Sequence, residues 1–461
     1  MNLGKMAGLA LGSIFRPQAR PRDFTLEEVA GFAPERVFPK GFLIGAATAA
    51  HQVEGGLEND WTDWERSKYP DGKPHIADAT VSGRACDSWN RFDEDVRCLK
   101  ALNANAYRWS IEWARLEPEE GRWDQAAADR YKSWIDQLAA AGIQSMVTAY
   151  HFTLPRWVAK DGGWQNDRTI DRFEAFVRKV AAEFGGRPGM WCTVNEPTVV
   201  AIQGYLRGIW PPGLKDEAAT AWALARVLKG HARAAAILKA TGKPVGVAHH
   251  VRLLHPASWS PLDKVIARVS DHFVNDVVVE CHRTGRIQMM IPGKVAIDEA
   301  VPDLKGSFDY LGINYYTRDH VKTDFKDKSM SKQFVPEGRP KSDLGWDIYP
   351  AGLHHTLLRW KGLGLPIYIT ENGIADAGGE RRAAYLTAHL YAVERALRDG
   401  ADVRGYFHWS LMDNFEWAEG YVARFGLFKM DHTDPELRRV PTPAVAVFQE
   451  FAKKLAAAGK G

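Results

Sequence analysis

The chain has 461 residues, of which 45% are hydrophobic and 25% charged, a composition typical of a globular protein with a large core. Its 60 basic and 57 acidic residues leave a net charge of +3, and nothing in this balance points to nucleic acid or an anionic surface as a partner. The four cysteines have no CxxC spacing, which argues against a structural zinc site or a disulfide framework and fits a reduced compartment.

The first 35 residues lack the alternation of apolar runs and helical segments that begins at Pro39. We predict that residues 1–35 form a poorly ordered leader and that residues 36–461 form one catalytic domain. The apolar run Met6–Phe15 weakly resembles a signal peptide or a surface anchor, but it is short, and no run approaches the length of a membrane span. We therefore expect a cytoplasmic protein without stable membrane insertion. Export or attachment to a membrane surface through residues 1–20 is the alternative.

From Pro39 onward, short apolar runs alternate with longer segments of helical spacing. The predicted helices include 126–141, 170–184, 218–240 and 382–398. Eight strands alternating with helices, without a linker, predict an α/β fold in which a single (β/α)₈ TIM barrel carries long βα loops. A doubly wound open sheet is the alternative, but no GxGxxG follows the first strand. The eight predicted strands are Phe42–Ala46, Ala106–Ile111, Gln144–Ala149, Met190–Val194, Val245–His249, Tyr310–Ile313, Pro366–Thr370 and Val403–Trp409.

Polar and ionisable side chains gather where these apolar runs end. In a barrel of this kind the carboxyl ends of the strands form one rim, and catalytic residues lie there. Each residue alone has an ordinary structural explanation, but together they predict a site on that rim. We interpret His249 and His250, at the predicted end of the fifth strand, as loop or supporting residues rather than metal ligands. In chain order the candidates are Gln52, Arg108, His151, Asn195, Glu196, Asn314, Tyr316, Glu371, Trp409, Glu416 and Trp417.

Two carboxylates stand out among these candidates. Glu371 ends the buried run IYIT, and Glu196 ends the fourth strand. Because strands four and seven are not adjacent, the two side chains are expected to face each other across the barrel mouth. Hydrolysis of a glycosidic bond needs such a pair, one carboxyl protonated to assist the leaving oxygen and the other ionised to attack or to activate water. The chain has no HxH, HExxH, GxSxG or Gly-rich phosphate loop, so we predict no metal and no cofactor.

The motifs around these carboxylates resemble a known family. WCTVNEP (Trp191–Pro197) and ITENG (Ile369–Gly373) are similar to the two catalytic signatures of glycoside hydrolase family 1, the retaining β-glycosidases on a (β/α)₈ barrel. GFLIGAATAAHQVEG (Gly41–Gly55) resembles the N-terminal signature of that family. YRWSIEWARLEP, LGINYYT and GYFHWSLMDNFEWAEGY resemble its second, sixth and eighth strand regions. The resemblance extends through nearly the whole chain after residue 38.

The resemblance implies a role for each candidate. Glu196 matches the acid/base and Glu371 the nucleophile, while Arg108 and Tyr316 match residues that hold the nucleophile. Asn195 matches the residue that binds the sugar 2-hydroxyl, and Trp409 matches the aromatic platform beneath the ring. The other substrate-binding positions are Gln52, His151, Asn314, Glu416 and Trp417.

The implied activity is that of a retaining exo-β-glycosidase. We expect a β-glucosidase with β-galactosidase or β-fucosidase side activity, acting on a small β-glycoside or oligosaccharide. The sequence leaves the oligomeric state open, and a homo-oligomer is one alternative. A sugar-binding barrel that has lost catalysis is the least favoured hypothesis, because it predicts a missing carboxylate and both are present.

Some positions depart from the family pattern. His151 is followed by Phe152 where the family usually has Trp, and Phe cannot donate a hydrogen bond, so the choice among gluco-, galacto- and fucosides stays open. Glu112 stands where many members have Ser, and AHQVEGG with NDWTDWE (Asn59–Glu65) is more similar to the archaeal branch. YHFTLPRW, GIWPP and RRAAYL are similar to a plant galactolipid-remodelling branch, which makes a transglycosidase acting on an alcohol or lipid-sugar acceptor the alternative. Glu416 and Trp417 replace the Ser and Lys of 6-phospho-glycosidases, which argues against a phosphorylated glycon.

Overall fold

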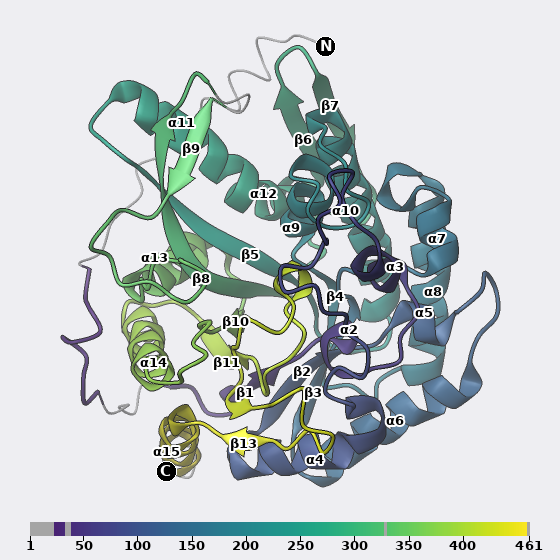
Figure 1. Cartoon of the computed structure of the whole chain (residues 1–461), viewed down its shortest axis with the longest axis vertical. Coiled ribbons are helices and arrows are strands. Elements are labelled where there is room, and N and C mark those ends of the chain that lie inside the picture. Colours follow the sequence, from purple (N-terminus) through teal and green to yellow (C-terminus); the bar gives the residue numbers. More distant parts are fainter. Residues whose placement is uncertain (1–22, 33–37, 327–329, 459–461) are drawn as a thin grey trace.

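The computed structural model describes residues 23–32, 38–326 and 330–458, and its centre is a closed parallel barrel (Figure 1). The strand order is β10-β11-β1-β2-β3-β4-β5-β8, and a further pairing between β10 and β8 closes the ring. The predicted (β/α)₈ fold is therefore confirmed. The barrel strands are β1 (Leu43–Ala47), β2 (Ala106–Ser110), β3 (Gln144–Tyr150), β4 (Met190–Asn195), β5 (Val245–Pro256), β8 (Tyr310–Thr323), β10 (Ile367–Asn372) and β11 (Val403–Trp409).

Long amphipathic helices surround the barrel and bury one face against it. In α8 (Arg168–Phe184), for example, Ile170, Phe173, Val177 and Phe184 recur at helical spacing and are buried. All four helices predicted from the sequence are present within two residues of their expected bounds. The other long outer helices are α4 (Ser88–Ala101), α6 (Gln125–Ala140), α10 (Glu217–Lys239), α12 (Val277–Thr284), α13 (Ala351–Trp360), α14 (Arg382–Arg398) and α15 (Pro443–Ala458).

The loops that follow the barrel strands carry short helices. These are the segments from which the rim of the barrel is built, and several of them hold candidate site residues. They comprise α2 (Ala50–Val53), α3 (Asp60–Arg66), α5 (Trp113–Leu116), α7 (Arg156–Lys160), α9 (Pro197–Ala201), η1 (Gly163–Gln165), η2 (Ile202–Leu206), η3 (His272–Asp276) and η5 (Trp417–Glu419). The longer helix α11 (Pro261–Asp271) follows β5, and η4 (Lys361–Leu363) follows α13.

Two barrel strands continue well beyond their predicted ends. β5 was expected to stop at His249 and β8 at Ile313, but they run to Pro256 and Thr323 and remain paired to their ends. The polar pair His249–His250 suggested a strand end, whereas the continued pairing with β8 satisfies the backbone of both strands past it. β9 (Ser331–Phe334) then adds an antiparallel strand to β8.

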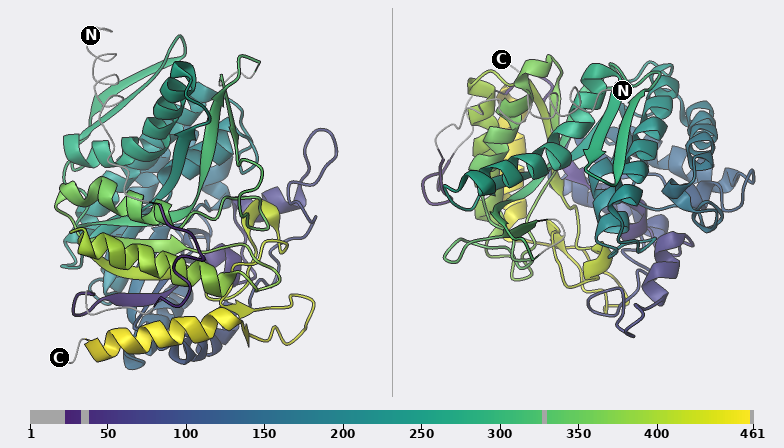
Figure 2. Two further views of the ribbon diagram at one scale, coloured as in Figure 1. Left: turned by 90° about the vertical axis from the view of Figure 1, so that its left-hand side faces the viewer. Right: turned by 90° about the horizontal axis from the view of Figure 1, so that it is seen from above.

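Smaller hairpins also lie outside the predicted elements. β6 (Arg286–Ile291) pairs with β7 (Val295–Ala300), and β12 (Phe428–Lys429) pairs with β13 (Val440–Pro441). The β6–β7 hairpin and the β8–β9 ribbon project from the same end of the molecule (Figure 2). These excursions leave the ring of eight strands intact.

The described part of the N-terminal region packs on the barrel's outer layer. Phe24 is buried and its ring lies edge-on to Tyr391 of α14 at 5.0 Å. Residues 1–22 and 33–37 lie outside the described residues, so the prediction of a leader over residues 1–35 stays a prediction.

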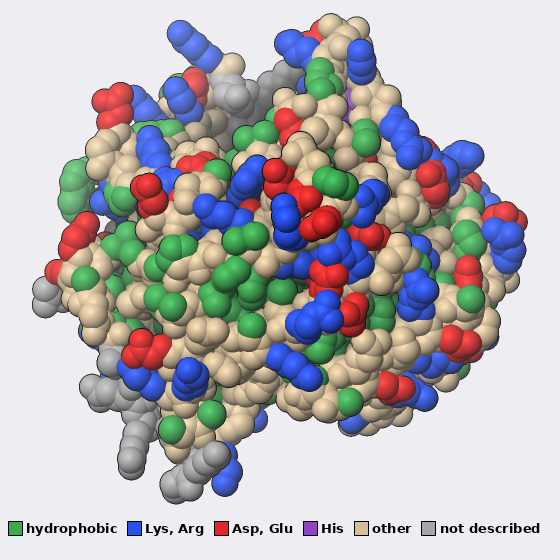
Figure 3. All heavy atoms as spheres, turned by 60° about the horizontal axis from the view of Figure 1, so that its bottom comes forward, with side chains coloured by type: hydrophobic (Ala, Val, Ile, Leu, Met, Phe, Trp, Pro, Cys, Tyr) green, Lys and Arg blue, Asp and Glu red, His purple; other side chains and the backbone are tan. Residues whose placement is uncertain are grey.

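Among the described residues, none of the helices has the length and apolar character that a membrane span requires. Acidic and basic side chains are interspersed on the face shown in Figure 3.

Candidate active site

The predicted site residues come from strands on all sides of the barrel. Glu371 lies in β10, Arg108 in β2, and Asn195 at the end of β4. Glu196 follows directly as the residue before α9, with a left-handed backbone (φ +46°) that few non-glycine residues adopt. Glu371 and Glu196 are nearly buried, at 4% and 6% exposure. Burial of two carboxylates is costly, and each therefore needs partners.

Both oxygens of Glu371 accept a hydrogen bond. Arg108 Nη1 donates to Oε1 at 2.5 Å, and the Tyr316 hydroxyl donates to Oε2 at 2.6 Å. Arg108 is itself only 1% exposed, so its charge is balanced by this carboxylate rather than by water. The two donors favour the ionised form of Glu371 and fix its orientation.

Glu196 has a different set of partners. Asn314 Nδ2 donates to Oε1 of Glu196 at 2.8 Å, and Nδ1 of His250 lies 3.3 Å from the same oxygen. His250 was predicted to be a loop or supporting residue. The loop is wrong, because His250 lies inside β5, and its place beside the candidate acid/base is that of a supporting residue. A histidine pair inside an otherwise apolar strand was the signal that could have revealed it.

Asn195 links the surroundings of the two carboxylates. Its Oδ1 accepts from Arg108 Nη2 at 2.6 Å and from Asn314 Nδ2 at 3.1 Å. A continuous set of hydrogen bonds thus joins Glu371, Arg108, Asn195, Asn314 and Glu196. Because these groups come from β10, β2, β4 and β8, their relative positions are set by the whole barrel.

The charges around the pair shift both carboxyl pKa values. Burial raises the pKa of Glu371, Arg108 lowers it and the charge of Glu196 raises it, and the result is about 7. Burial also raises the pKa of Glu196, but the neighbouring His250 and the Asn314 amide outweigh burial, and the pKa falls below its usual value. Arg108, next to Glu371, is always charged.

A second polar group lies around Glu416. Gln52 Nε2 and Trp409 Nε1 each donate to Oε2 of Glu416 at 3.3 Å, and Gln52 also donates to the Phe415 carbonyl at 2.8 Å. Burial raises the pKa of Glu416 to about 8. A buried carboxylate with two neutral donors is well suited to accept hydrogen bonds from sugar hydroxyls.

Aromatic rings stack around His151. Trp409 and Trp417 lie nearly parallel to the His151 ring, each with a centroid distance of 6.0 Å. Asn195 Nδ2 lies 3.1 Å from Nε2 of His151, which connects these rings to the hydrogen bonds around the carboxylates. All of the site residues predicted from the sequence therefore lie in two connected groups on one rim.

Phe152 has an unusual backbone conformation and packs against two tryptophan rings. Its backbone has φ +76°, and its ring lies 4.8 Å from Trp210 and 5.1 Å from Trp417. The next residue, Thr153, donates to the buried carboxylate of Glu112 at 2.9 Å, which holds this strained turn. Neither Trp210 nor this role of Glu112 followed from the sequence. Among the described residues, no group of three His, Cys, Asp or Glu side chains is placed to hold a metal ion.

Comparisons with known proteins identify the family of this chain. The sequence pattern described as "Glycosyl hydrolase family 1" matches residues 34–456. The chain belongs to this family. The resemblance inferred from the sequence motifs is therefore confirmed, and the protein is a β-glycosidase, a hydrolase that acts on O-glycosyl bonds.

Individual members of family 1 are similar to this chain over most of its length. The chain is 35% identical to beta-glucosidase A of Thermotoga maritima over 427 residues, 86% of this chain and 94% of that protein. It is 30% identical to a beta-galactosidase of Pyrococcus woesei, over 90% of this chain and 97% of that one. The solved structure of a beta-glycosidase from Pyrococcus horikoshii has a TM-score of 0.83 and 34% identity, covering 91% of this chain and 95% of that chain.

Proposed function

We propose that this family 1 enzyme is a retaining exo-β-glycosidase, chiefly a β-glucosidase, with Glu371 as nucleophile and Glu196 as acid/base. The proposal depends above all on one observation, the hydrogen-bond chain that joins Glu371 to Glu196 through Arg108, Asn195 and Asn314. A permanently charged guanidinium holds the nucleophile, while the neutral Asn314 amide holds the acid/base.

In the first step, Glu371 attacks the anomeric carbon of the terminal sugar. The bond from that carbon to the glycosidic oxygen breaks. In the reactive form of the enzyme the one proton that the two carboxyls share is on Glu196, which gives it to the departing oxygen. The Tyr316 hydroxyl and Arg108 hold the attacking carboxylate in place. The products of this step are the free aglycone and a sugar joined to Glu371 by an ester bond.

In the second step, Glu196 accepts a proton from water, and the oxygen of that water attacks the anomeric carbon. The ester bond breaks, Glu371 regains its negative charge, and the sugar leaves with its original β configuration. Glu371 is neutral while esterified, so its repulsion of a negative charge on Glu196 is absent during this step. The pKa of Glu196 is then lower, as a base requires.

The sugar itself is proposed to bind between the two polar groups of the site. Gln52, Glu416 and Trp409 would hold hydroxyls far from the anomeric carbon, and Asn195 would hold the 2-hydroxyl. In the free enzyme burial raises the pKa of Glu416 to about 8. Sugar hydroxyls that donate to Glu416 would lower this pKa and favour its ionised form.

Chemical rescue tests the two assigned carboxylates. Glu371→Ala should lose hydrolysis by several orders of magnitude and regain turnover with azide, giving an α-glycosyl azide, because azide enters the space of the missing nucleophile. Glu196→Ala should retain glycosylation by aryl glycosides with good leaving groups and yield a β-glycosyl azide. Product anomers are read by NMR. Near-wild-type hydrolysis by Glu371→Ala, or the same azide anomer from both variants, would contradict the assignment.

The preferred sugar is tested with p-nitrophenyl β-glycosides that differ only in the glycon. We expect the glucoside to have the highest kcat/KM, followed by the galactoside and fucoside; the printed names of the relatives include both a glucosidase and a galactosidase. The same reaction with an added alcohol acceptor measures transfer against hydrolysis. We expect water to be the dominant acceptor, and a majority of transfer product would instead favour the transglycosidase alternative.

A further inference from the structure

Beyond the catalytic carboxylates, β5 carries a charged side chain near the rim of the barrel. His250 contacts Glu196, and Arg252 follows it by two residues in the same strand, so both side chains lie on one face of β5. Trp346 lies close to both Tyr316 and Arg252: its ring is 5.7 Å from the Tyr316 ring and 5.7 Å from the Arg252 guanidinium carbon. Because the second polar group of the site is assigned to the sugar, Trp346 and Arg252 are left to contact the aglycone.

The direction of the Arg252 side chain is fixed by its neighbours. Its Nε and Nη2 donate to the two carboxylate oxygens of Asp319 on β8, at 2.5 and 3.1 Å, and Asp319 is only 4% exposed. The Asn275 side chain accepts from the backbone N–H of Arg252 at 3.1 Å and donates to its carbonyl at 2.8 Å. Arg252 and Asp319 are therefore a positioned pair whose charges balance.

Arg207 brings a second positive charge close to this pair. It directly follows η2, in the loop that starts at Glu196. Arg207 is exposed to solvent, yet burial by the surrounding protein and the charge of Arg252 lower the pKa of its guanidinium, whereas the charge of Asp319 raises it. Arg207 forms no ion pair with an Asp or Glu among the described residues. The three side chains together keep one positive charge in excess, because an arginine stays charged.

We propose that the enzyme prefers β-glycosides whose aglycone is an aromatic ring that carries a carboxylate. The ring packs on Trp346, and Arg207 donates hydrogen bonds to the carboxylate beside the balanced ion pair. Asp347, which follows Trp346, does not offset this charge, because it is buried and accepts from Arg318 at 2.6 Å. A cationic aglycone meets the excess positive charge and is disfavoured. The inference rests on the proposed function and names the aglycone class of the same site.

Three phenyl β-glucosides that differ only in the para substituent test the proposal. A propenoate supplies the negative charge at pH 7, a propenamide is its neutral analogue, and an aminomethyl group is cationic. The acid and the amide have nearly the same shape, so the ratio of their kcat/KM values isolates the effect of charge. The wild type should favour the acid by about fivefold, and the ratio should fall as salt is raised.

Substitutions of Arg207 separate its charge from its packing. In Arg207→Gln the preference for the acid over the amide should fall by about fivefold, and in Arg207→Lys most of it should remain. Arg207→Glu should improve the aminomethyl glucoside relative to the propenoate by about tenfold compared with the wild type. A purely structural role of Arg207 would lower kcat/KM for all three substrates without changing their order.

A matched control excludes a general effect of net charge. Arg178→Gln removes a charged side chain that is 64% exposed on α8, and it should leave the ratio of acid to amide unchanged. Hydrolysis of the amide shows that each variant is folded. The same ratio in the wild type, Arg207→Gln and Arg207→Glu would overturn the inference and leave the proposed function intact, and an equal change in Arg178→Gln would overturn it as well. A wild type that hydrolyses none of the three β-glucosides would instead contradict the proposed function.

Discussion

At the residue scale, a substitution of His250 tests what sets the pKa of Glu196. Burial raises the pKa of Glu196, and the His250 imidazole, whose Nδ1 lies 3.3 Å from Glu196 Oε1, lowers it. In His250→Asn that interaction is lost, so Glu196 should hold its proton to higher pH. We predict that the alkaline limb of the kcat/KM profile moves upward by about half a unit or more for a glycoside with a poor leaving group.

The leaving group provides the control for this prediction. An aryl glycoside with a very good leaving group needs little protonation by Glu196, so the alkaline limb of its profile should shift much less in His250→Asn. A purely structural role for His250 would instead lower kcat/KM at every pH without moving the limb. An unshifted limb with the poor leaving group would therefore refute the assigned role.

Glu416, a predicted sugar-binding residue, is expected to lower the free energy of unfolding. Burial raises its pKa from 4.5 to about 8, so between these values the folded chain retains a proton that the unfolded chain has released. Stability therefore falls as pH rises through this window. Glu416→Gln lacks this titration, and we predict that it is more stable than the wild type at pH 8 by about 4 kcal/mol, since the rise of the pKa from 4.5 to about 8 is worth about 1.4 kcal/mol for each pKa unit.

The measurement is urea unfolding of both proteins between pH 5 and pH 8, with the difference expected to grow with pH. The same variant should lose about a hundredfold in kcat/KM, because the amide replaces one acceptor oxygen of the carboxylate with a donor. A stability difference that does not change with pH would show that Glu416 is not the titrating group.

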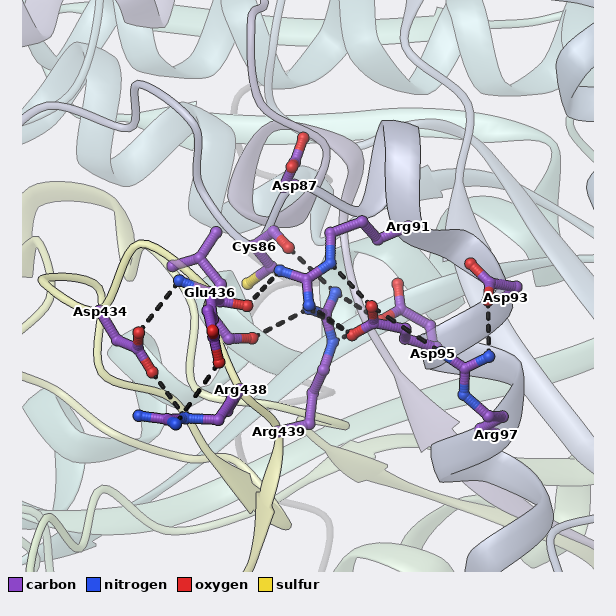
Figure 4. Close-up of polar contacts among 12 residues, drawn as sticks. Cys86, Asp87, Arg91, Asp93, Asp95, Arg97, Asp434, Glu436, Arg438 and Arg439 are labelled. Atoms are coloured by element: carbon purple, nitrogen blue, oxygen red, sulfur yellow. Dashed lines mark hydrogen bonds and ion pairs between the residues drawn. The ribbon is translucent and has the colours of Figure 1, made fainter.

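At the element scale, the segment before β13 is tied to α4 through Arg439 (Figure 4). Arg439 Nη2 donates to Asp95 at 2.9 Å and to the Cys86 carbonyl at 2.9 Å, and both charged side chains are almost fully buried. Arg439→Met leaves Asp95 buried without its partner. We predict a loss of about 3–5 kcal/mol in the free energy of unfolding, measured by urea denaturation.

Two further variants separate ion pairing from packing. Arg438, the neighbouring residue, is exposed and pairs with Asp434 at 2.9 Å, so Arg438→Met should cost at most about 1 kcal/mol. The double variant Arg439→Met/Asp95→Leu removes both charges and should recover much of the stability lost in Arg439→Met. If the single and double variants are equally unstable, the loss comes from packing of the guanidinium rather than from the unpaired carboxylate.

The elements of the barrel were predictable because each one is encoded locally. Apolar runs of strand length and helical spacing in segments such as 382–398 are visible in a single sequence, and Arg382–Arg398 is the observed helix. The extensions of β5 and β8 could not be predicted in this way, because their stability comes from pairing with each other rather than from a pattern in either strand. The β6–β7 hairpin was missed for the same reason.

The same contrast applies to the site. Strand ends located the polar residues, and the family resemblance supplied roles for Glu371, Arg108 and Tyr316, whose side chains do lie in contact. The approach of His250 to Glu196 depends on the register between β4 and β5, and the bulge in that pairing lies between Cys192 and Asn195. Such a register is a property of the closed sheet and has no signature in either segment alone.

At the scale of the whole molecule, the site exists only when the barrel is closed. Glu196 follows β4 and Glu371 lies in β10, and these strands are joined only through their neighbours in the ring. A ligand that contacts both carboxylates therefore binds the folded barrel and not the unfolded chain. We predict that a gluco-configured iminosugar at about a hundred times its Kd raises the free energy of unfolding by about 2.7 kcal/mol.

This stabilisation should shift the entire unfolding transition. Calorimetry, tryptophan fluorescence and far-UV circular dichroism should move together to higher temperature, because opening any barrel strand separates the groups that hold the inhibitor. Glu371→Gln weakens binding of a cationic iminosugar by removing its counter-charge, so the same inhibitor concentration should produce a much smaller shift. If only part of the wild-type transition moved to higher temperature, one part of the barrel would unfold while the site stays intact. The conclusion that the site requires the closed barrel would then be wrong.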